Sequence, residues 1–280
     1  NTDAIDNSAG VDCSDHEVNI KIAFSSLVAN QSLAIEKRNG VLESMTDEVA
    51  RLVLKDNILQ TLALTVAEQL GATRLEAQTR LMYALEKKGL LTRSVEDLPN
   101  DKQLTELQEN NQGLTRPELA VLLSYSKMDL YRALIESDVL DDEYFTGELL
   151  RYFPEDMQSD YRDALLSHPL KREIIGTVIT NSLVNRVGCT FVSDLMESHD
   201  ADPRDIAVAY VLVRDGFSLR DQWRALDALT GTIDNNEQAK YFNRLQLFVE
   251  KLVAWLLENN SAPLNVKDLN ERLILPAKEL

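Results

Sequence analysis

The stretch "TDEVARLVLKDNILQTLALTVAEQL", residues 46–70, decides the predicted fold. Its apolar residues, among them Val49, Ile58 and Val66, recur mostly every three or four positions, which is the pattern of an amphipathic helix. Acidic residues stand in its first turn, where the helix dipole favours negative charge. Gly71 follows the last residue as a stop signal. The stretch therefore predicts one long helix with one buried face.

The sequence on both sides of this stretch continues the same pattern. Pro and Gly are scarce, at seven and ten residues, and most of them stand at breaks between apolar runs. Further helices are predicted at residues 142–152, 155–167, 170–187, 190–199, 203–215, 218–229, 234–259 and 266–274. The β-branched run "IIGTVITNSLV" (174–184) fits a strand or a buried helix, and its length favours the helix. The predicted fold class is therefore mainly α, a multi-helix domain.

Two helix starts are predicted from capping residues. The segment "LTRPEL" places Thr115 at an N-cap and Glu118 at the third helical position, with a proline between them, which is a capping box. Thr73 is predicted to cap another helix, which ends in the basic pair before Gly89. The polar residues 92–113 predict a loop with a short helix.

Composition excludes several classes of partner. The 280 residues carry a formal net charge of −17, which opposes binding to nucleic acid or to an anionic membrane surface, because both need basic residues. No apolar run approaches the roughly 20 residues that span a bilayer. Cys13 and Cys189 are the only cysteines and imply no disulfide framework, so a reducing cytoplasm is the predicted location.

The opening stretch "NTDAIDNSAGVDCSDHEVN" crowds polar and acidic side chains around small ones. Asn7–Gly10 can form a tight turn whose amides face a cofactor or an anionic substrate, because small residues let a backbone approach closely. The alternative is a polar loop that ends in a helix cap, with Ser14 as N-cap and Glu17 completing a capping box. Composition alone favours this structural alternative, and both interpretations stay open at this point.

Cys13 and His16 stand three residues apart beside Glu17, which raises the question of a metal site or a nucleophile–base pair. Zinc needs three or four ligands at recognisable spacing, and no second Cys or His pair completes such a set. A Cys13 nucleophile lacks a third group to orient its base. We therefore predict no metal site, and we expect His168 and His199 to be helix-end residues.

Aromatic and aliphatic residues on the predicted 234–259 helix share one face. That face consists of Tyr241, Leu245, Phe248, Leu252 and Trp255. Such a stripe predicts core packing rather than a cofactor site, and the same packing is predicted for Trp223. Arg172, Asn181 and Asn185 interrupt an otherwise apolar helix. Helix–helix hydrogen bonds are predicted to satisfy them, and contacts to a neighbouring domain are the alternative.

Several long segments resemble one protein family. They read, in order, "NTDAIDNSAGVDCSDHEVNIKI", "MTDEVARLVLKDNILQTLAL", "GLTRPELAVLLSYSKMDLY", "YFP" and "HPLKREIIGTVITNSLVNRVG". This ordered set closely resembles the C-terminal part of the large bacterial NAD-specific glutamate dehydrogenases. The resemblance runs from Asn1 to at least Asn259. In that family a helical C-terminal region follows a substrate domain and a Rossmann-type NAD-binding domain.

The resemblance implies a division of this chain. Residues 1–20 would be the tail end of the NAD-binding catalytic domain, a short remnant of a Rossmann-type fold, and residues 21–280 would be the C-terminal helical domain. The chain would then be a fragment of a longer cytoplasmic enzyme that is a homo-oligomer at full length. That enzyme would convert L-glutamate, NAD and water into 2-oxoglutarate, ammonia and NADH in glutamate catabolism. The family's catalytic lysines and acid and its Gly-rich dinucleotide turn would lie upstream, so no catalytic residue is expected here.

Two site residues carry over from the family's pattern to the opening stretch. The frame "NSAGVDCSDHE" (7–17) is similar to a signature of the smaller hexameric glutamate dehydrogenases, with Ala9 in place of a glycine. By that match, Asn7 would lie near the nicotinamide end of NAD. Ser14 would contact the side-chain carboxylate of glutamate or 2-oxoglutarate.

A fragment without the upstream pockets is expected to be inactive and not to bind NAD on its own, because hydride transfer needs the cofactor held against the substrate. Its partners would be the missing catalytic domains, and we expect the opening stretch to be poorly anchored without them. The alternative function is a stand-alone helical module that binds a protein or an effector. A reproducible thermal shift with amino acids or nucleotides would favour that alternative.

Overall fold

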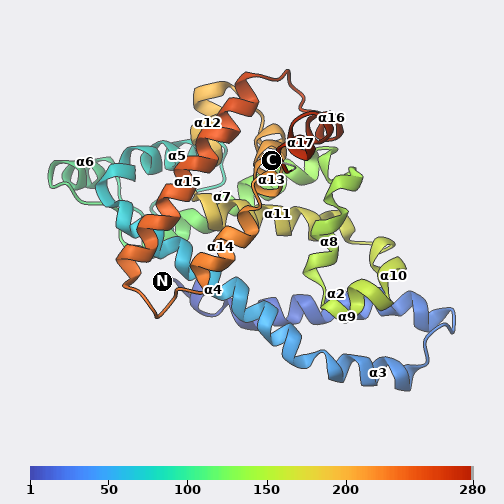
Figure 1. The fold of residues 1–280 in the computed structure, drawn as a ribbon. Helices are drawn as coiled ribbons and strands as arrows, with labels where there is room; N and C mark the ends of the chain where they lie inside the picture. Colours follow the sequence, from blue (N-terminus) through green and yellow to red (C-terminus); the bar gives the residue numbers. More distant parts are fainter. Residues whose placement is uncertain (279–280) are drawn as a thin grey trace. The chain divides into compact units, whose positions relative to one another are not determined.

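A computed structural model describes residues 1–278, and these residues form helices joined by loops, with no β-strand (Figure 1). One isolated bridge pairs Thr230 with Ile233. The prediction of a mainly α fold is therefore confirmed for the described residues. None of their helices combines the length and the apolar character that crossing a bilayer requires.

The chain divides into two compact units. The first unit contains Asn1–Thr61 and Leu140–Ile179, and the second contains Leu62–Val139 and Thr180–Leu280. Each unit therefore combines two separate stretches of sequence. The division falls within α4 (Thr46–Leu70), η2 (Val139–Asp141) and α11 (Lys171–Val187).

The first unit forms its core where α10 packs against α2 and α8. The helical elements that lie wholly within this unit are α1 (Asp3–Asp6), α2 (Ser8–Ala29), α3 (Ile35–Ser44), η3 (Glu143–Phe145), α8 (Thr146–Tyr152), α9 (Glu155–Asp160) and α10 (Arg162–Leu166). Phe24 of α2 is fully buried, and its ring packs edge-on against Tyr161, with ring centroids 4.8 Å apart. α3 buries none of its residues.

The second unit is organised around α13 (Pro203–Gly216). Every residue from Ile206 to Val213 is at most 2% exposed. A helix that is apolar on all sides must be surrounded by other elements. Those that contact α13 here are α7 (Arg116–Glu136), α12 (Phe191–His199), α14 (Leu219–Asp227) and α15 (Asn235–Glu258). Asp202 begins the helix, because its carboxylate accepts the backbone N–H of Arg204 at 2.8 Å.

The helical elements of the second unit follow one another with short connections. Beside α13 they are η1 (Gly71–Arg74), α5 (Leu75–Lys87), α6 (Asp101–Glu109), α7 (Arg116–Glu136), α12 (Phe191–His199), α14 (Leu219–Asp227), α15 (Asn235–Glu258), α16 (Val266–Leu269), η4 (Asn270–Ile274) and α17 (Leu275–Lys278).

Most of the helix predictions are confirmed. The long 46–70 helix is α4, and the β-branched run 174–184 lies within α11. Thr115 and Glu118 form the predicted capping box, in which the Glu118 carboxylate accepts the Thr115 backbone N–H at 2.6 Å. Thr73 is not an N-cap, because it lies within η1 and its hydroxyl donates to the backbone oxygen of Leu70.

The helix predicted at 155–167 is interrupted at Tyr161. Its backbone leaves the helical region at φ −125° and ψ 25°, so α9 and α10 are separate elements. The Tyr161 ring meets Phe24, which is distant in sequence. The interruption therefore accompanies a tertiary contact that the local pattern does not contain.

The prediction of a Rossmann-type remnant at residues 1–20 is not matched by the structure. These residues form α1 and the first part of α2, and no strand accompanies them within the described range. Ile5 of α1 is buried, and Ile20 on α2 is buried one helical turn before Phe24, which is also buried. The stretch therefore buries a helix face rather than a strand.

The predicted packing of the aromatic face on α15 is wrong in part. Trp223 is buried as predicted, whereas Tyr241, Phe248 and Trp255 are exposed. The reason is that α15 buries the neighbouring face, turned by about 100° around the helix. The apolar residues buried on that face are Ala239, Phe242, Val249, Val253 and Leu256.

The polar residues of α11 have different environments. The Arg172 guanidinium pairs with the carboxylate of Asp141 inside the first unit, which confirms the prediction of a contact between elements. Asn185 is buried in the second unit, and its Oδ1 has no hydrogen-bond partner among the described residues. The predicted helix–helix hydrogen bond is therefore not observed for that atom.

Candidate functional site

α2 and the residue before it carry both side chains that the family pattern assigns to the site. Asn7 stands directly before the helix at φ −111° and ψ 15°, and its exposed side chain makes no capping hydrogen bond. Ser14 is exposed inside α2, and its hydroxyl donates to the backbone oxygen of Gly10 at 3.1 Å. Both side chains are therefore accessible in the structure.

Two local predictions for the opening stretch are wrong. Ser8–Gly10 belong to the first turn of α2, so the tight turn predicted for Asn7–Gly10 is not formed. Ser14 is not an N-cap, because the helix begins six residues before it. Its hydroxyl instead bonds to the carbonyl four residues back, as serines inside helices commonly do.

The opening stretch is also held in place by polar contacts within the first unit. Asn57 Nδ2 of α4 donates to the backbone oxygen of Ile5 at 3.0 Å and to Ser8 Oγ at 3.1 Å. Gln60 Nε2 reaches the same Ser8 Oγ at 3.3 Å. The expectation of a poorly anchored stretch is therefore wrong for α1 and for the start of α2.

Asn7 and Ser14 lie on the same side of α2. Seven residues correspond to about two helical turns, so the two positions are separated by roughly 10 Å along the helix axis. Val11 and Val18, which share this side, are 63% and 52% exposed. This side of α2 has small and polar side chains between two exposed valines, and it is open to a ligand or to another part of a protein.

The opposite side of α2 is held by a buried polar cluster. The His16 ring stacks on Tyr152 of α8, with centroids 4.3 Å apart and an interplanar angle of 20°. Asn19 Nδ2 donates to the Tyr152 hydroxyl at 2.9 Å. His168 Nδ1 accepts the Leu170 backbone N–H at 3.1 Å, so its Nε2 carries the proton and donates to the Asn19 backbone oxygen at 3.1 Å.

Burial keeps the ring groups of this cluster uncharged at neutral pH. It lowers the pKa of His16, against an opposing effect of Asp15. It also lowers the pKa of His168, although the hydrogen bond to the Asn19 backbone acts in the other direction. Burial raises the pKa of Tyr152 to about 12. Neutral groups that pack in this way hold α2 in position.

Acidification is expected to destabilise the first unit through these histidines. Their folded-state pKa values lie below the ordinary value of 6.5, so the unfolded chain binds more protons and stability falls as pH drops below that value. Urea unfolding between about pH 7.5 and about pH 5.5 measures the loss. His16→Phe keeps an aromatic ring against Tyr152 and removes one titrating group, so its stability should depend less steeply on pH. An equal slope in this variant would contradict the prediction.

The two cysteines lie in different environments. Cys13 is exposed on α2, while Cys189 is buried, and burial raises the pKa of the Cys189 thiol to about 12. His16, which was considered as a base for Cys13, faces Tyr152 instead. Within residues 1–278, no three His, Cys, Asp or Glu side chains gather as a metal ion would need.

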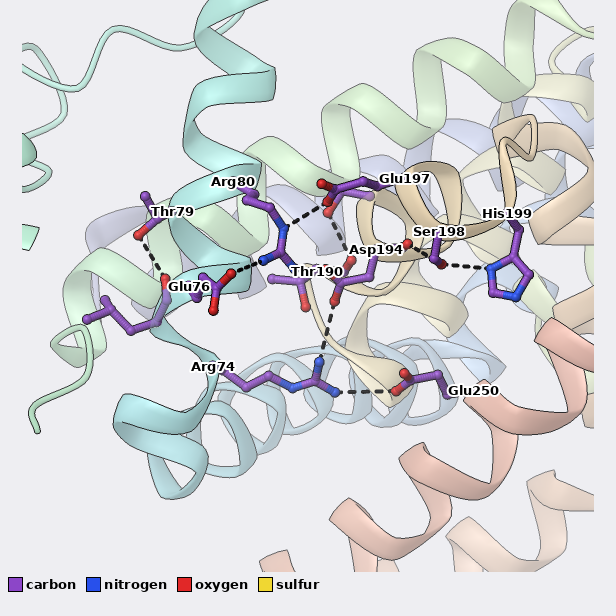
Figure 2. Close-up of polar contacts among 12 residues, drawn as sticks. Arg74, Glu76, Thr79, Arg80, Thr190, Asp194, Glu197, Ser198, His199 and Glu250 are labelled. Carbon is purple, nitrogen blue, oxygen red and sulfur yellow. Dashed lines mark hydrogen bonds and ion pairs between the residues drawn. The ribbon is translucent and has the colours of Figure 1, made fainter. Parts of the chain in front are cut away.

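A second polar cluster lies in the second unit and joins four of its helical elements (Figure 2). Arg80 of α5 contacts Glu76 at 2.9 Å and Asp194 of α12 at 3.1 Å. Arg74 of η1 contacts the other oxygen of Asp194 at 3.4 Å and Glu250 of α15 at 3.4 Å. Asp194 therefore bridges both guanidinium groups. Since the pairs are part-exposed, we interpret this cluster as an orienting contact between elements.

Ser198 and His199, at the end of α12, resemble part of a catalytic triad in composition only (Figure 2). Ser198 Oγ lies 2.7 Å from His199 Nδ1, and His199 Nε2 lies 3.1 Å from Glu258. The same Ser198 hydroxyl lies 2.6 Å from the backbone oxygen of Asp194, so its single proton has two competing acceptors. A nucleophile also needs donors for an oxyanion, and the hydrogen bonds of this exposed serine to described residues include none.

Neither the cluster around His16 nor the cluster around Asp194 was predicted from the sequence. The spacing of Glu76 and Arg80 was a readable signal, because residues four apart on a helix are neighbours. The contacts of Arg80 with Asp194 and of His16 with Tyr152 join residues more than one hundred positions apart. No local pattern could have predicted those contacts.

Comparison with protein families gives two matches along the chain. Residues 111–280, more than half of the chain, match the family model described as glutamate dehydrogenase, C-terminal. Residues 1–67 match the model described as bacterial NAD-glutamate dehydrogenase, catalytic domain. The chain is therefore a helical protein in which a region of the C-terminal type (residues 111–280) follows a region that matches the catalytic-domain model (residues 1–67). The chain belongs to the glutamate dehydrogenase family.

Three relatives are NAD-specific glutamate dehydrogenases. The chain is 43% identical over 261 residues to that of Halomonas elongata, which covers 93% of this chain and 16% of the relative. It is 43% identical over 259 residues to that of Pseudomonas aeruginosa, which covers 92% of this chain and 16% of the relative. It is 36% identical over 267 residues to that of Mycobacterium tuberculosis, which covers 95% of this chain and 16% of the relative. The chain therefore spans 16% of the length of these relatives.

The family matches and the compact units place different limits on the predicted division of the chain after residue 20. The catalytic-domain match extends to residue 67, whereas the resemblance placed a boundary after residue 20. The compact units divide the chain differently again, since the first unit includes Leu140–Ile179. The boundary at residue 20 therefore stays a prediction.

Proposed function

We propose that this chain is the C-terminal portion of a larger NAD-dependent glutamate dehydrogenase. The full enzyme would oxidise L-glutamate with NAD and water to 2-oxoglutarate, ammonia and NADH. The supporting observation is the order of the two family matches, with the catalytic-domain type at residues 1–67 and the C-terminal type at residues 111–280. The cytoplasm is its proposed location, and the full-length enzyme is proposed to be a homo-oligomer.

In this proposal the exposed side of α2 faces the substrate in the full enzyme. Residues 1–20 contribute the helical tail end of the NAD-binding domain. Ser14 donates a hydrogen bond to the side-chain carboxylate of glutamate, and Asn7 lies near the nicotinamide end of NAD. The exposure of both side chains on one side of α2 supports these roles, because that side is available to a ligand. The buried His16–Tyr152 stack on the other side holds the helix in position.

Ser14→Ala in the full-length enzyme tests the substrate role. A hydrogen bond to a charged group contributes about 1.5–3 kcal/mol, so the KM for glutamate should rise roughly 10- to 100-fold. Ser25→Ala is the matched control, since Ser25 is also exposed on α2 and its hydroxyl donates to the carbonyl four residues back, at 2.7 Å. The control should leave KM unchanged. An unchanged KM in Ser14→Ala would remove Ser14 from the site.

The 280-residue chain alone is proposed to have a structural or regulatory role and no dehydrogenase activity. Hydride transfer requires NAD and glutamate to be held against each other, and the Gly-rich turn that the family uses for the dinucleotide does not occur in this sequence. We expect isothermal titration calorimetry to detect no NAD binding at submillimolar concentrations. A clear binding isotherm would overturn this part of the proposal.

A further inference from the structure

α15 has a second apolar face that no described residue covers fully. Tyr241, Phe248 and Trp255 are 45%, 38% and 49% exposed, and they recur every seven residues. Leu245 and Leu252 lie between them and are half-buried. We call these five residues the α15 seam. Large apolar side chains in a continuous exposed row are unusual unless something binds there.

The spacing of the α15 seam specifies the shape of its partner. From Tyr241 to Trp255 the steps are four, three, four and three residues, which is the repeat of helices that pack side by side along their length. Phe217 extends the seam sideways, because its ring packs edge-on against Phe248 with centroids 5.4 Å apart. The surface therefore fits an amphipathic helix.

The orientation of α15 is fixed by contacts on its other sides. Phe242, Val249 and Val253 bury the adjacent face in the core of the second unit. Glu250, on the side opposite the seam, pairs with Arg74 in the cluster of Figure 2. The α15 seam is therefore held outward by the packing of the unit.

The charges beside the seam specify the chemistry of its partner. Arg244 and Lys251 flank the seam and are exposed, and neither forms an ion pair with a described side chain. The Arg244 guanidinium lies over the Tyr241 ring, 5.8 Å from its centroid. Two cations without counter-charges are notable in a chain of net charge −17. They favour a partner with acidic residues beside its apolar row.

These charges also disfavour a second copy of α15 as the partner. In an antiparallel pair centred on Phe248, Arg244 of one copy faces Lys251 of the other. Like charges that face each other across a helix pair are unfavourable. A different helix with an acidic flank avoids that repulsion.

We propose that the α15 seam binds an acidic amphipathic helix supplied by residues of the same larger protein outside residues 1–280. This inference rests on the part of the proposed function that makes the chain a portion of a longer protein. The share of the relatives that the chain covers supports that source, since the chain spans only 16% of their length. Binding of this helix would connect the C-terminal helical region to the rest of the protein.

The test compares the full-length protein with the 280-residue chain. The Phe248→Cys variants of both proteins are treated with a water-soluble maleimide. Peptide mass spectrometry then follows labelling at residue 248 separately from labelling at Cys13. The labelling rate should be at least about tenfold lower in the full-length protein, because a bound helix excludes reagent from the seam. Leu247→Cys is the matched control, since Leu247 is 51% exposed and is turned away from the seam. Its rate should be equal in both proteins.

A charge-reversal variant tests the acidic flank. Arg244→Glu combined with Lys251→Glu should raise the Phe248→Cys labelling rate in the full-length protein towards that of the chain. Lys87→Glu combined with Lys102→Glu changes the net charge equally on exposed positions of α5 and α6, and it should leave the rate low. A low Phe248→Cys labelling rate in both double variants would overturn the proposal that the docked helix has an acidic flank.

The remaining outcomes separate this inference from the proposed function. Equal Phe248→Cys rates in an enzyme that oxidises glutamate with NAD would overturn the docking helix and leave the function intact. A protected seam in a full-length protein without that activity would support docking and contradict the function. A dimer of the 280-residue chain in sedimentation velocity that Phe248→Glu dissolves would overturn the proposed source and assign the seam to a second copy.

Discussion

Asp215→Asn is expected to lower the free energy of unfolding by about 3–5 kcal/mol, because it removes a carboxylate charge that lies directly against the buried guanidinium of Arg214. Arg214 is 0% exposed, and its Nε and Nη2 lie 2.9 Å and 3.3 Å from the two carboxylate oxygens of Asp215. Asn has nearly the same volume as Asp, so the loss reports on charge rather than on a cavity. Urea unfolding followed by circular dichroism measures it.

Two controls distinguish this effect from general sensitivity to charge removal. Asp221→Asn removes an ion pair with Arg224 in which both side chains are largely exposed, and it should change stability little. Arg214→Met combined with Asp215→Asn removes the buried charge together with the carboxylate that contacts it. This double variant should be more stable than Asp215→Asn alone. A double variant that is less stable than Asp215→Asn would contradict the interpretation that the buried Arg214 charge needs a nearby carboxylate.

Phe24→Ala is expected to cost about 3–5 kcal/mol, the usual range for deleting a buried aromatic ring. Phe24 is fully buried in the first unit, and its ring contacts Tyr161 at the break between α9 and α10. The substitution removes the transfer free energy of the ring and leaves a cavity beside α2. Thermal or urea unfolding measures the loss, and the first unit should be the part affected.

Phe217→Ala is the control for that substitution. Phe217 is 40% exposed, so its deletion creates no closed cavity and should cost much less. If the two substitutions had equal effects, the core of the first unit would not depend on Phe24. The comparison also shows whether the two compact units unfold together, since the substitutions lie in different units.

Local sequence patterns predicted the helices well. α4, α11, α13 and α15 were each predicted to within two residues at both ends, because apolar spacing and end signals act over a few residues. The capping box at Thr115 was predicted for the same reason. Thr73 shows the limit of this approach, because the 3-10 turn η1 leads directly into α5 and no side chain caps the start of that helix.

The candidate site was predicted less completely. The resemblance pointed to Asn7 and Ser14, and the structure leaves both exposed on one side of α2. Their roles stay predictions. The stack of His16 on Tyr152 and its hydrogen-bonded neighbours were not predicted, because each contact joins distant parts of the chain. The same holds for the Asp194 bridge between Arg74 and Arg80.

The sequence by itself determined the helical class, the positions of most helices and the resemblance to a family. These properties depend on short-range spacing or on ordered motifs, both of which are readable along the chain. Tertiary structure decided which apolar face of each helix is buried. On α15 two adjacent faces are apolar, and only the packing around α13 determines that Phe242 is buried while Trp255 is exposed. Burial depends on neighbours that are distant in sequence, so periodicity alone could not distinguish the two faces.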